Sequence, residues 1–341
     1  MPTRIEAEIM RPWRLNEKPV VSIICITYNH QSYIKDALES FLAQETDFPF
    51  EIIVHDDAST DSTSTLVKQY AEKYPHIVKP IFQKENRSSQ LKKNVLLPII
   101  LTAISYAQGQ YIAYCDGDDY WIDKDKLKIQ ISEMQKFPNC EMSFHPVMRK
   151  STNGRKRKKI IAKHSANNKI FETKQLILGS ARFCPTVSFI FKKCVFESIP
   201  NWLFDAPCTD YFMQVLTSLK GGALYINRAM AVYRERSIGS WSEKVTIDEN
   251  LVYDYYIGML QALDDINAQT ENKFKKEFNI IKKKLCFFMS ANPALSSSTR
   301  KKIFKNHRNI FSIKRKIIWY LIFRNKKLLK LTSNAYDYMF R

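Results

Sequence analysis

The sequence predicts an α/β protein built on a doubly wound, mixed and mostly parallel sheet with flanking helices. Strand-like and helix-like segments alternate strictly over about 130 residues, which is typical of such sheets. The first strand-like segment, residues 20–26, is a continuous apolar run rich in β-branched residues, as expected of a strand covered on both faces. The 341 residues are 45% apolar and 13% aromatic, which is enough for a packed core and excludes disorder as the main state.

The individual elements follow from apolar runs and from apolar side chains spaced by three and four residues. Ser32 is placed to cap a helix that starts near Ile34, and Pro98 suits the first turn of a helix that Gly109 stops. The predicted strands are residues 20–26, 50–55, 77–82, 111–115 and 142–147, with a further apolar segment at 187–191. The predicted helices are residues 34–42, 66–74, 98–107, 127–134 and 210–220, and the chain beyond Trp241 has a helical pattern.

Charge and cysteine content limit the class of protein. Residues 273–341 hold 19 Lys or Arg and two acids, a balance of +17 out of +19 for the whole chain, so the first 272 residues are almost neutral. The seven cysteines form no CxxC pair, which disfavours a zinc ribbon or a disulfide scaffold and favours a reducing compartment. Residues 1–18 lack the apolar core of a secretory signal, and the apolar stretch 317–323 is far below the roughly 20 residues of a membrane span. We therefore expect a cytoplasmic protein.

Three polar turns follow predicted strands, at residues 27–30, 56–61 and 116–119. Ligands of doubly wound sheets bind outside the carboxyl ends of the strands, so we expect these turns to open on one edge. Asp116, Asp118 and Asp119 place three carboxylates within four residues, and a hard divalent cation would relieve their repulsion. A solvated acidic turn is the plain alternative. In the second turn, Asp61 suits turn and capping chemistry, whereas Asp57 is a candidate contact to a base or ribose.

The sequence PVVSIICITYNHQSYIKDALESFLAQETDFPFEIIVHDDASTDST and the later YIAYCDGDDYW resemble the family 2 glycosyltransferases. These are inverting enzymes of the GT-A fold that build bacterial surface polysaccharides. The resemblance continues through Pro185 to Ser188, Cys208 to Tyr211 and Val232 to Arg234, and it covers about residues 19–242. It implies an N-terminal lead at residues 1–18, a GT-A catalytic domain at 19–245 and a basic helical region at 246–341.

The resemblance also implies a role for individual residues. Asp118 would ligate Mn²⁺ or Mg²⁺ on the diphosphate, and Asp210, the acid at a later helix start, would be the general base. Many relatives carry a histidine shortly after the Tyr-Arg pair, a region in which this chain has Arg236, and this arginine could pair with the diphosphate. Trp241 and Tyr211 could stack on an acceptor sugar. The other nucleotide-sugar contacts implied are Thr27, Tyr28, Asn29, Asp57, Asp116 and Gly117. The QxxRW signature of processive synthases is missing, which favours transfer of a single sugar.

The partners implied are a nucleotide-sugar donor, with UDP favoured through the family, and a glycan or lipid-linked glycan acceptor. The basic C-terminal helices suit an anionic membrane surface, which would make the protein peripheral on the inner face of the cytoplasmic membrane. A helical cap packed on the catalytic domain is the alternative, and a homo-oligomer formed through these helices is a further option. The competing functions are a protein that binds nucleic acid or an anionic membrane through the basic tail, and a nucleotidyltransferase. No nucleic-acid partner is expected, because the basic residues form no recognised groove-reading motif.

Overall fold

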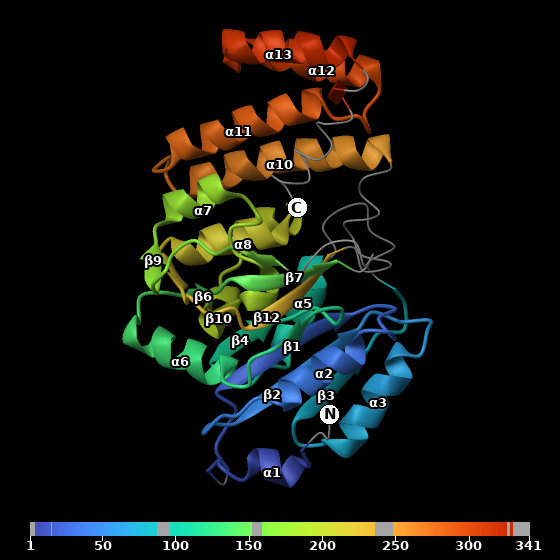
Figure 1. Ribbon diagram of the computed structural model, residues 1–341, viewed down its shortest axis with the longest axis vertical. Coiled ribbons are helices and arrows are strands. Elements are labelled where there is room, and N and C mark those ends of the chain that lie inside the picture. Colours follow the sequence, from blue (N-terminus) through green and yellow to red (C-terminus); the bar gives the residue numbers. More distant parts are fainter. Residues whose placement is uncertain are drawn as a thin grey trace.

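The computed structural model describes residues 4–14, 16–86, 96–151, 159–235, 248–325 and 328–329 (Figure 1). Its strands form one sheet of eight and one of four, in the orders β3-β2-β1-β4-β10-β6-β11-β9 and β5-β12-β7-β8. The strands of the large sheet are β1 (Val21–Thr27), β2 (Phe50–Asp56), β3 (Val78–Phe82), β4 (Tyr111–Tyr114), β6 (Met142–Phe144), β9 (Lys169–Phe171), β10 (Ile190–Lys192) and β11 (Ala223–Tyr225). Those of the small sheet are β5 (Tyr120–Trp121), β7 (Val147–Ser151), β8 (Lys159–Ile161) and β12 (Ala231–Glu235).

The large sheet is parallel at β1, β2 and β4, the strands that the predicted polar turns follow. Strand β1 lies between β2 and β4, with parallel pairing on both sides, and β3 continues the parallel order beyond β2. Strand β10 is antiparallel to both β4 and β6, so the sheet is mixed in its second half. All seven residues of β1 and of β2 are buried, as the continuous apolar run of β1 predicts. The mixed, mostly parallel sheet predicted from the sequence is confirmed.

Helices cover both faces of the large sheet and continue into a C-terminal stack (Figure 1). The helices before residue 220 are α1 (Glu6–Met10), α2 (Ile34–Leu42), α3 (Thr63–Lys73), α5 (Leu96–Ser105), α6 (Lys126–Lys136), α7 (Thr173–Gly179) and α8 (Thr209–Ser218). Short 3₁₀ turns lie at Thr186–Ser188, Lys193–Phe196, Asn201–Phe204 and Arg308–Ile310. The C-terminal helices are α10 (Glu249–Gln269), α11 (Lys275–Ser290), α12 (Ser297–His307) and α13 (Ile313–Arg324).

Two local predictions were wrong. The single strand expected at 142–147 is divided into β6 and β7, which belong to different sheets. The division falls at His145 and Pro146, where a proline cannot donate a ladder hydrogen bond. Helix α2 has Tyr33 rather than Ser32 at its N-cap, and no side chain caps it. The backbone N–H groups of Tyr33 and Ile34 instead donate to the carbonyl of His30 at 2.8 Å.

The N-terminal segment packs on the sheet domain. Ile9 is buried in the same apolar core as strands β1 and β2. Arg4 donates to the carbonyls of Leu42 and Gln44, and the hydroxyl of Tyr74 donates to the carbonyl of Arg4. These contacts tie residues 4–14 to the far ends of α2 and α3.

The helices α10 and α11 form a cap on the sheet domain. Val252, Met259 and Leu263 of α10 share one apolar core with Phe212 and Val215 of α8. Helices α10 and α11 therefore pack on the sheet domain. Among the residues described, we find no helix whose length and apolar character suit a bilayer crossing.

Candidate active site

The three polar turns meet at the carboxyl edge of β1, β2 and β4, as the sequence predicts. Thr27 pairs with Asp56 in the register of β1 and β2. The N–H of Asp57 donates to the carbonyl of Thr27 at 3.0 Å, and that of Gly117 donates to the carbonyl of Ile26 at 2.9 Å. One edge of the sheet thus gathers the residues expected to hold a nucleotide and a cation.

Hydrogen bonds between the first two turns hold Asn29 in a left-handed conformation with φ of 54°. Its N–H donates to Ser59 Oγ at 2.9 Å, and its Oδ1 accepts from the N–H of Thr60 at 2.8 Å. Asparagine tolerates this conformation better than most residues. Tyr28 is half-buried in the same turn.

The acids of the second turn divide into two groups. Asp56 accepts hydrogen bonds from the hydroxyls of Ser59 and Ser64, and Asp61 accepts from the N–H groups of Gln31 and Thr63, so both organise the turn. The turn and capping chemistry expected of Asp61 is therefore confirmed. Asp57 is 1% exposed at the strand end, directly beside Thr27.

The acidic loop between β4 and β5 concentrates negative charge. The hydroxyl of Tyr114 donates to Oδ1 of Asp116 at 2.7 Å. Burial, followed by the charge of Asp118, raises the pKa of Asp116 to about 8. Asp119 is 3% exposed and accepts from the N–H of Arg234 at 2.7 Å, and burial raises its pKa as well. A cation at this loop would offset the charge repulsion from Asp118, which adds to the effect of burial on the pKa of Asp116.

Asp116 and Asp118 suit a divalent cation that draws its remaining ligands from elsewhere. Within the described ranges, no three His, Cys, Asp or Glu side chains are grouped so that they could hold a metal ion. Mg²⁺ commonly binds through one or two carboxylates, with water and substrate phosphates completing its shell. The acidic loop therefore fits a metal that arrives with a diphosphate.

Space at the loop is limited at Gly117. A Cβ atom on this residue would lie 2.7 Å from Oγ1 and 2.9 Å from Cβ of Thr27, and 3.0 Å from Nδ1 of His30. The Thr27 and His30 atoms named here, Oγ1 and Nδ1, are buried and have no hydrogen-bond partner among the described residues. Polar groups left in this way at a strand edge suit a polar ligand. His30 is half-buried, and burial lowers its pKa.

Arg234 fixes the acidic loop, a role that the sequence does not predict. It is 5% exposed, its Nη1 donates to the carbonyl of Asp118 at 2.7 Å, and its Nη2 pairs with Asp36 of α2. The guanidinium lies 4.3 Å from the ring centroid of Tyr120 and 5.2 Å from that of Tyr33. An arginine within the largely apolar strand β12 could have indicated this role, because a buried arginine requires partners.

Asp210 lies in the first turn of α8, where the sequence places it. With Tyr114, Thr186 and Thr209 it forms the polar part of an otherwise apolar pocket between α5, α8 and the sheet. Burial raises the pKa of Asp210 to about 6, and its charge in turn helps to raise the pKa of Asp116. The charge of Asp210 therefore reaches Asp116 in the acidic loop.

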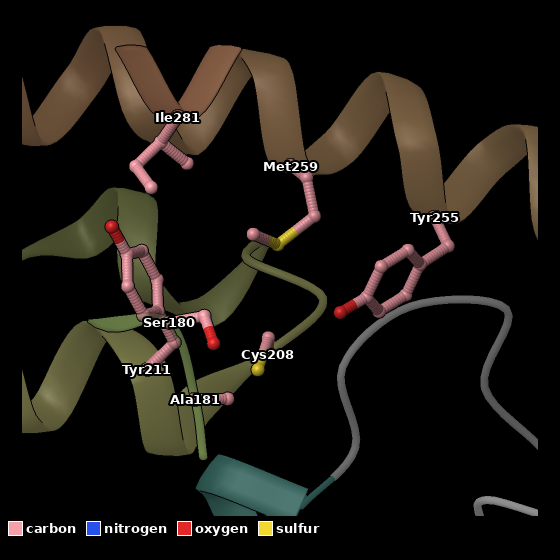
Figure 2. Close-up of a pocket in the computed structure, with 7 residues that line it drawn as sticks. All are labelled: Ser180, Ala181, Cys208, Tyr211, Tyr255, Met259 and Ile281. Carbon is pink, nitrogen blue, oxygen red and sulfur yellow. The ribbon is translucent and has the colours of Figure 1, made fainter. Parts of the chain in front are cut away.

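A second pocket shows how the C-terminal cap contacts the segment before Asp210 (Figure 2). The hydroxyl of Tyr255 on α10 points toward Cys208, and both residues line this pocket. One turn later, Gly258 lies against Pro207, where a Cβ atom would be 3.3 Å from the proline ring. Helix α10 thus supports the N-terminal end of α8.

The expected acceptor contacts fare differently. Tyr211 is 2% exposed, and its hydroxyl donates to the carbonyl of Ile177, so it packs between α7 and α8. This position contradicts the expectation that its ring stacks on an acceptor sugar. Arg236 and Trp241 lie outside the described residues.

The comparisons with known proteins agree with this geometry. The model of the family described as glycosyl transferase family 2 matches residues 22–199, more than half of the chain. The uncharacterized protein Rv1520 of Mycobacterium tuberculosis is 33% identical over 231 residues, which is 66% of this chain and 62% of that protein. TuaG of Bacillus subtilis, named for teichuronic acid biosynthesis, is 37% identical over 129 residues, 38% of this chain and 47% of TuaG. The chain thus matches less than two thirds of the length of either relative.

Two solved structures share the fold. The TarS 1–349 structure from Staphylococcus aureus in complex with UDP-GlcNAc has a TM-score of 0.54 at 21% identity, covering 72% of this chain and 66% of that one. The mannosyltransferase PcManGT from Pyrobaculum calidifontis, in complex with GDP-Man and Mn²⁺, has a TM-score of 0.53 at 17% identity, covering 95% and 86%. The predicted GT-A fold is confirmed. The family match and the shared fold together place this chain in glycosyl transferase family 2.

Proposed function

We propose that this protein transfers a single sugar from a UDP-sugar to a hydroxyl of a glycan or lipid-linked acceptor, in cell-surface polysaccharide synthesis. The observation that carries the proposal is the meeting of the turns at Thr27, Asp57 and Asp116 on one sheet edge, within electrostatic reach of Asp210. The family match, the name of TuaG and the nucleotide complexes of TarS and PcManGT support it.

In this proposal the donor lies across the carboxyl edge of β1, β2 and β4. Asp57 contacts the base, Asp116 the ribose, and Thr27, Tyr28 and Asn29 line the remaining nucleotide site. Gly117 allows the loop to approach Thr27, and Arg236 pairs with the diphosphate. Asp118 holds Mn²⁺ or Mg²⁺, which stabilises the departing diphosphate as a Lewis acid.

Asp210 is the proposed general base. A carboxyl with a pKa of about 6 is largely ionised at neutral pH, yet basic enough to accept the proton of an acceptor hydroxyl. The acceptor oxygen attacks the anomeric carbon as the bond to the diphosphate breaks, so the anomeric configuration inverts and no covalent enzyme intermediate forms. Trp241 remains the proposed aromatic contact to the acceptor.

The proposal is tested by UDP release and UDP binding with and without Mn²⁺. We expect the wild type to release UDP from a member of a UDP-sugar panel only with the metal, and Asp118→Ala to lose both release and metal-dependent binding. Asp47→Asn is the matched control, because this acid is 68% exposed and pairs with the exposed Lys128. Metal-independent release at the wild-type rate by Asp118→Ala would contradict the assignment.

A further inference from the structure

The outer side of α13 presents a row of large apolar side chains to solvent. Ile313, Ile317 and Leu321 are 77%, 56% and 57% exposed. Their spacing of four residues places them in one row along the helix. Tyr320, which is 50% exposed, borders the row. Single exposed apolar residues are ordinary, but a contiguous row marks an interaction surface.

The inner side of the same helix is already occupied. Trp319 is 4% exposed and stacks on Phe304 of α12, with ring centroids 3.8 Å apart. Its indole N–H donates to the carbonyl of Ser290 at the end of α11. This packing fixes the rotation of α13, so the exposed row faces away from the protein. Because α13 is apolar on both its inner and its outer side, its outer side also calls for an apolar partner.

The charge around the row indicates which environment this is. Residues 297–325 contain nine Lys or Arg and no Asp or Glu. Lys314 and Arg324, both exposed, lie on α13 itself, and the exposed Lys301 and Lys305 lie on the adjacent α12. The surface therefore combines an apolar row with lysines and arginines from a segment that contains no Asp or Glu.

We propose that the outer face of α13, defined by Ile313, Ile317, Tyr320 and Leu321, docks the protein onto an anionic lipid surface. Apolar side chains enter the headgroup boundary while the surrounding bases meet lipid phosphates, as in interfacial helices. A second copy of the chain would bring two such positive faces together, which their repulsion opposes. A nucleic acid would meet the bases but leave Ile313, Ile317 and Leu321 without an apolar partner. The inference stands independently of the sugar-transfer reaction.

The test is flotation of the full chain with vesicles of phosphatidylglycerol and phosphatidylcholine, at low and high salt. We expect flotation at low salt, weaker flotation at high salt, and none with phosphatidylcholine alone. The triple variant I313S/I317S/L321S should reduce partitioning by at least about tenfold, because three apolar side chains no longer enter the interface. Ile257→Ser on α10 is the matched control, since this residue is 46% exposed on another helix.

Two further measurements make the outcome decisive. The triple variant should keep the wild-type unfolding midpoint and the wild-type rate of UDP release in solution, which separates docking from folding and from the proposed reaction. Failure of the wild type to float at low salt, or equal flotation of the triple variant, would overturn the proposal. A dimer of the wild type that the triple variant abolishes would instead identify a second copy as the partner. Binding of an oligonucleotide without flotation would identify nucleic acid.

Discussion

The guanidinium of Arg234 donates a hydrogen bond of 2.7 Å to the backbone carbonyl of Asp118. The same side chain pairs with Asp36, so one residue of β12 joins helix α2 to the acidic loop. The positively charged side chain of Arg234 therefore helps to hold the loop that carries three neighbouring acids. This contact orders the backbone at the residue proposed to hold the metal.

We expect Arg234→Lys to weaken UDP binding in the presence of Mn²⁺ by about tenfold. A lysine keeps the charge but lacks the planar fork that reaches both Asp36 and the Asp118 carbonyl. The free energy of unfolding should fall by about 1–3 kcal/mol, because the partly buried carbonyl of Asp118 loses its donor. Calorimetric titration and urea unfolding measure the two effects. Arg228→Lys is the control, since Arg228 is 51% exposed and pairs with Asp123 at the surface. Wild-type affinity in Arg234→Lys would show that the loop is ordered without this fork.

Asp210→Asn should lose activity and gain stability. The rate of sugar transfer should fall by about two to four orders of magnitude, because the amide cannot accept the proton. Burial raises the pKa of Asp210 from 3.8 to about 6, so its stabilising contribution is complete below pH 3.8 and is lost as pH rises through about 6. Above that range the ionised carboxylate costs up to about 3 kcal/mol, which the neutral amide avoids.

Urea unfolding of Asp210→Asn and of the wild type at pH 4 and pH 8 checks this sign. The variant should be the more stable protein at pH 8, and the difference should shrink toward pH 4. Asp254→Asn, at an exposed position on α10, should match the wild type at both values. If Asp210→Asn were less stable than the wild type at pH 8, the carboxylate would be a structural partner of its surroundings.

The transfer rate of the wild type should fall as pH drops below about 6, as Asp210 becomes protonated. The pH profile of kcat/KM measures this decline in the enzyme without bound substrate. A profile that is flat from pH 5 to pH 8 would exclude Asp210 as the titrating base.

Gly117→Ala should abolish UDP binding while the protein still folds. The added methyl group would lie 2.7 Å from Thr27 Oγ1, so either the acidic loop or the Thr27 side chain must move. Titration with UDP and Mn²⁺ measures the loss, and circular dichroism confirms the fold. Gly258→Ala is the comparison, since its methyl group would meet only the Pro207 ring, at 3.3 Å. Normal UDP affinity in Gly117→Ala would show that the loop adapts to the methyl group.

Tyr255→Phe should lower kcat several-fold and leave the affinity for UDP unchanged. The change removes only the hydroxyl that points toward Cys208, two residues before Asp210. Tyr253→Phe on the same helix is the control, because Tyr253 is half-buried beside Tyr256. Equal kcat in Tyr255→Phe and the wild type would reduce this contact to packing.

The sequence predicts well those features that depend on short stretches of chain. Strands β1, β2 and β4 are local apolar runs, and parallel order alone brings their turns together. The pairing of Arg234 with Asp36 could not be predicted, because the two residues lie 198 positions apart and no local sequence pattern extends over that distance. The expected strand 142–147 is divided at His145 because β7 pairs in the small sheet. The packing of α10 and α11 depends on the apolar surface of α8. Both are set by tertiary contacts rather than by periodicity.

The contacts of Tyr255 with Cys208 and of Gly258 with Pro207 make the C-terminal helices unsuitable as exchangeable modules. The family match ends at residue 199, before α8 begins. A chimera designed from sequence similarity alone could therefore take Asp210 from one parent and the α10 residues that contact its segment from the other. A functional recombinant would have to inherit residues 207–211 and 255–259 from the same parent. The two segments should therefore diversify together among relatives that keep this cap.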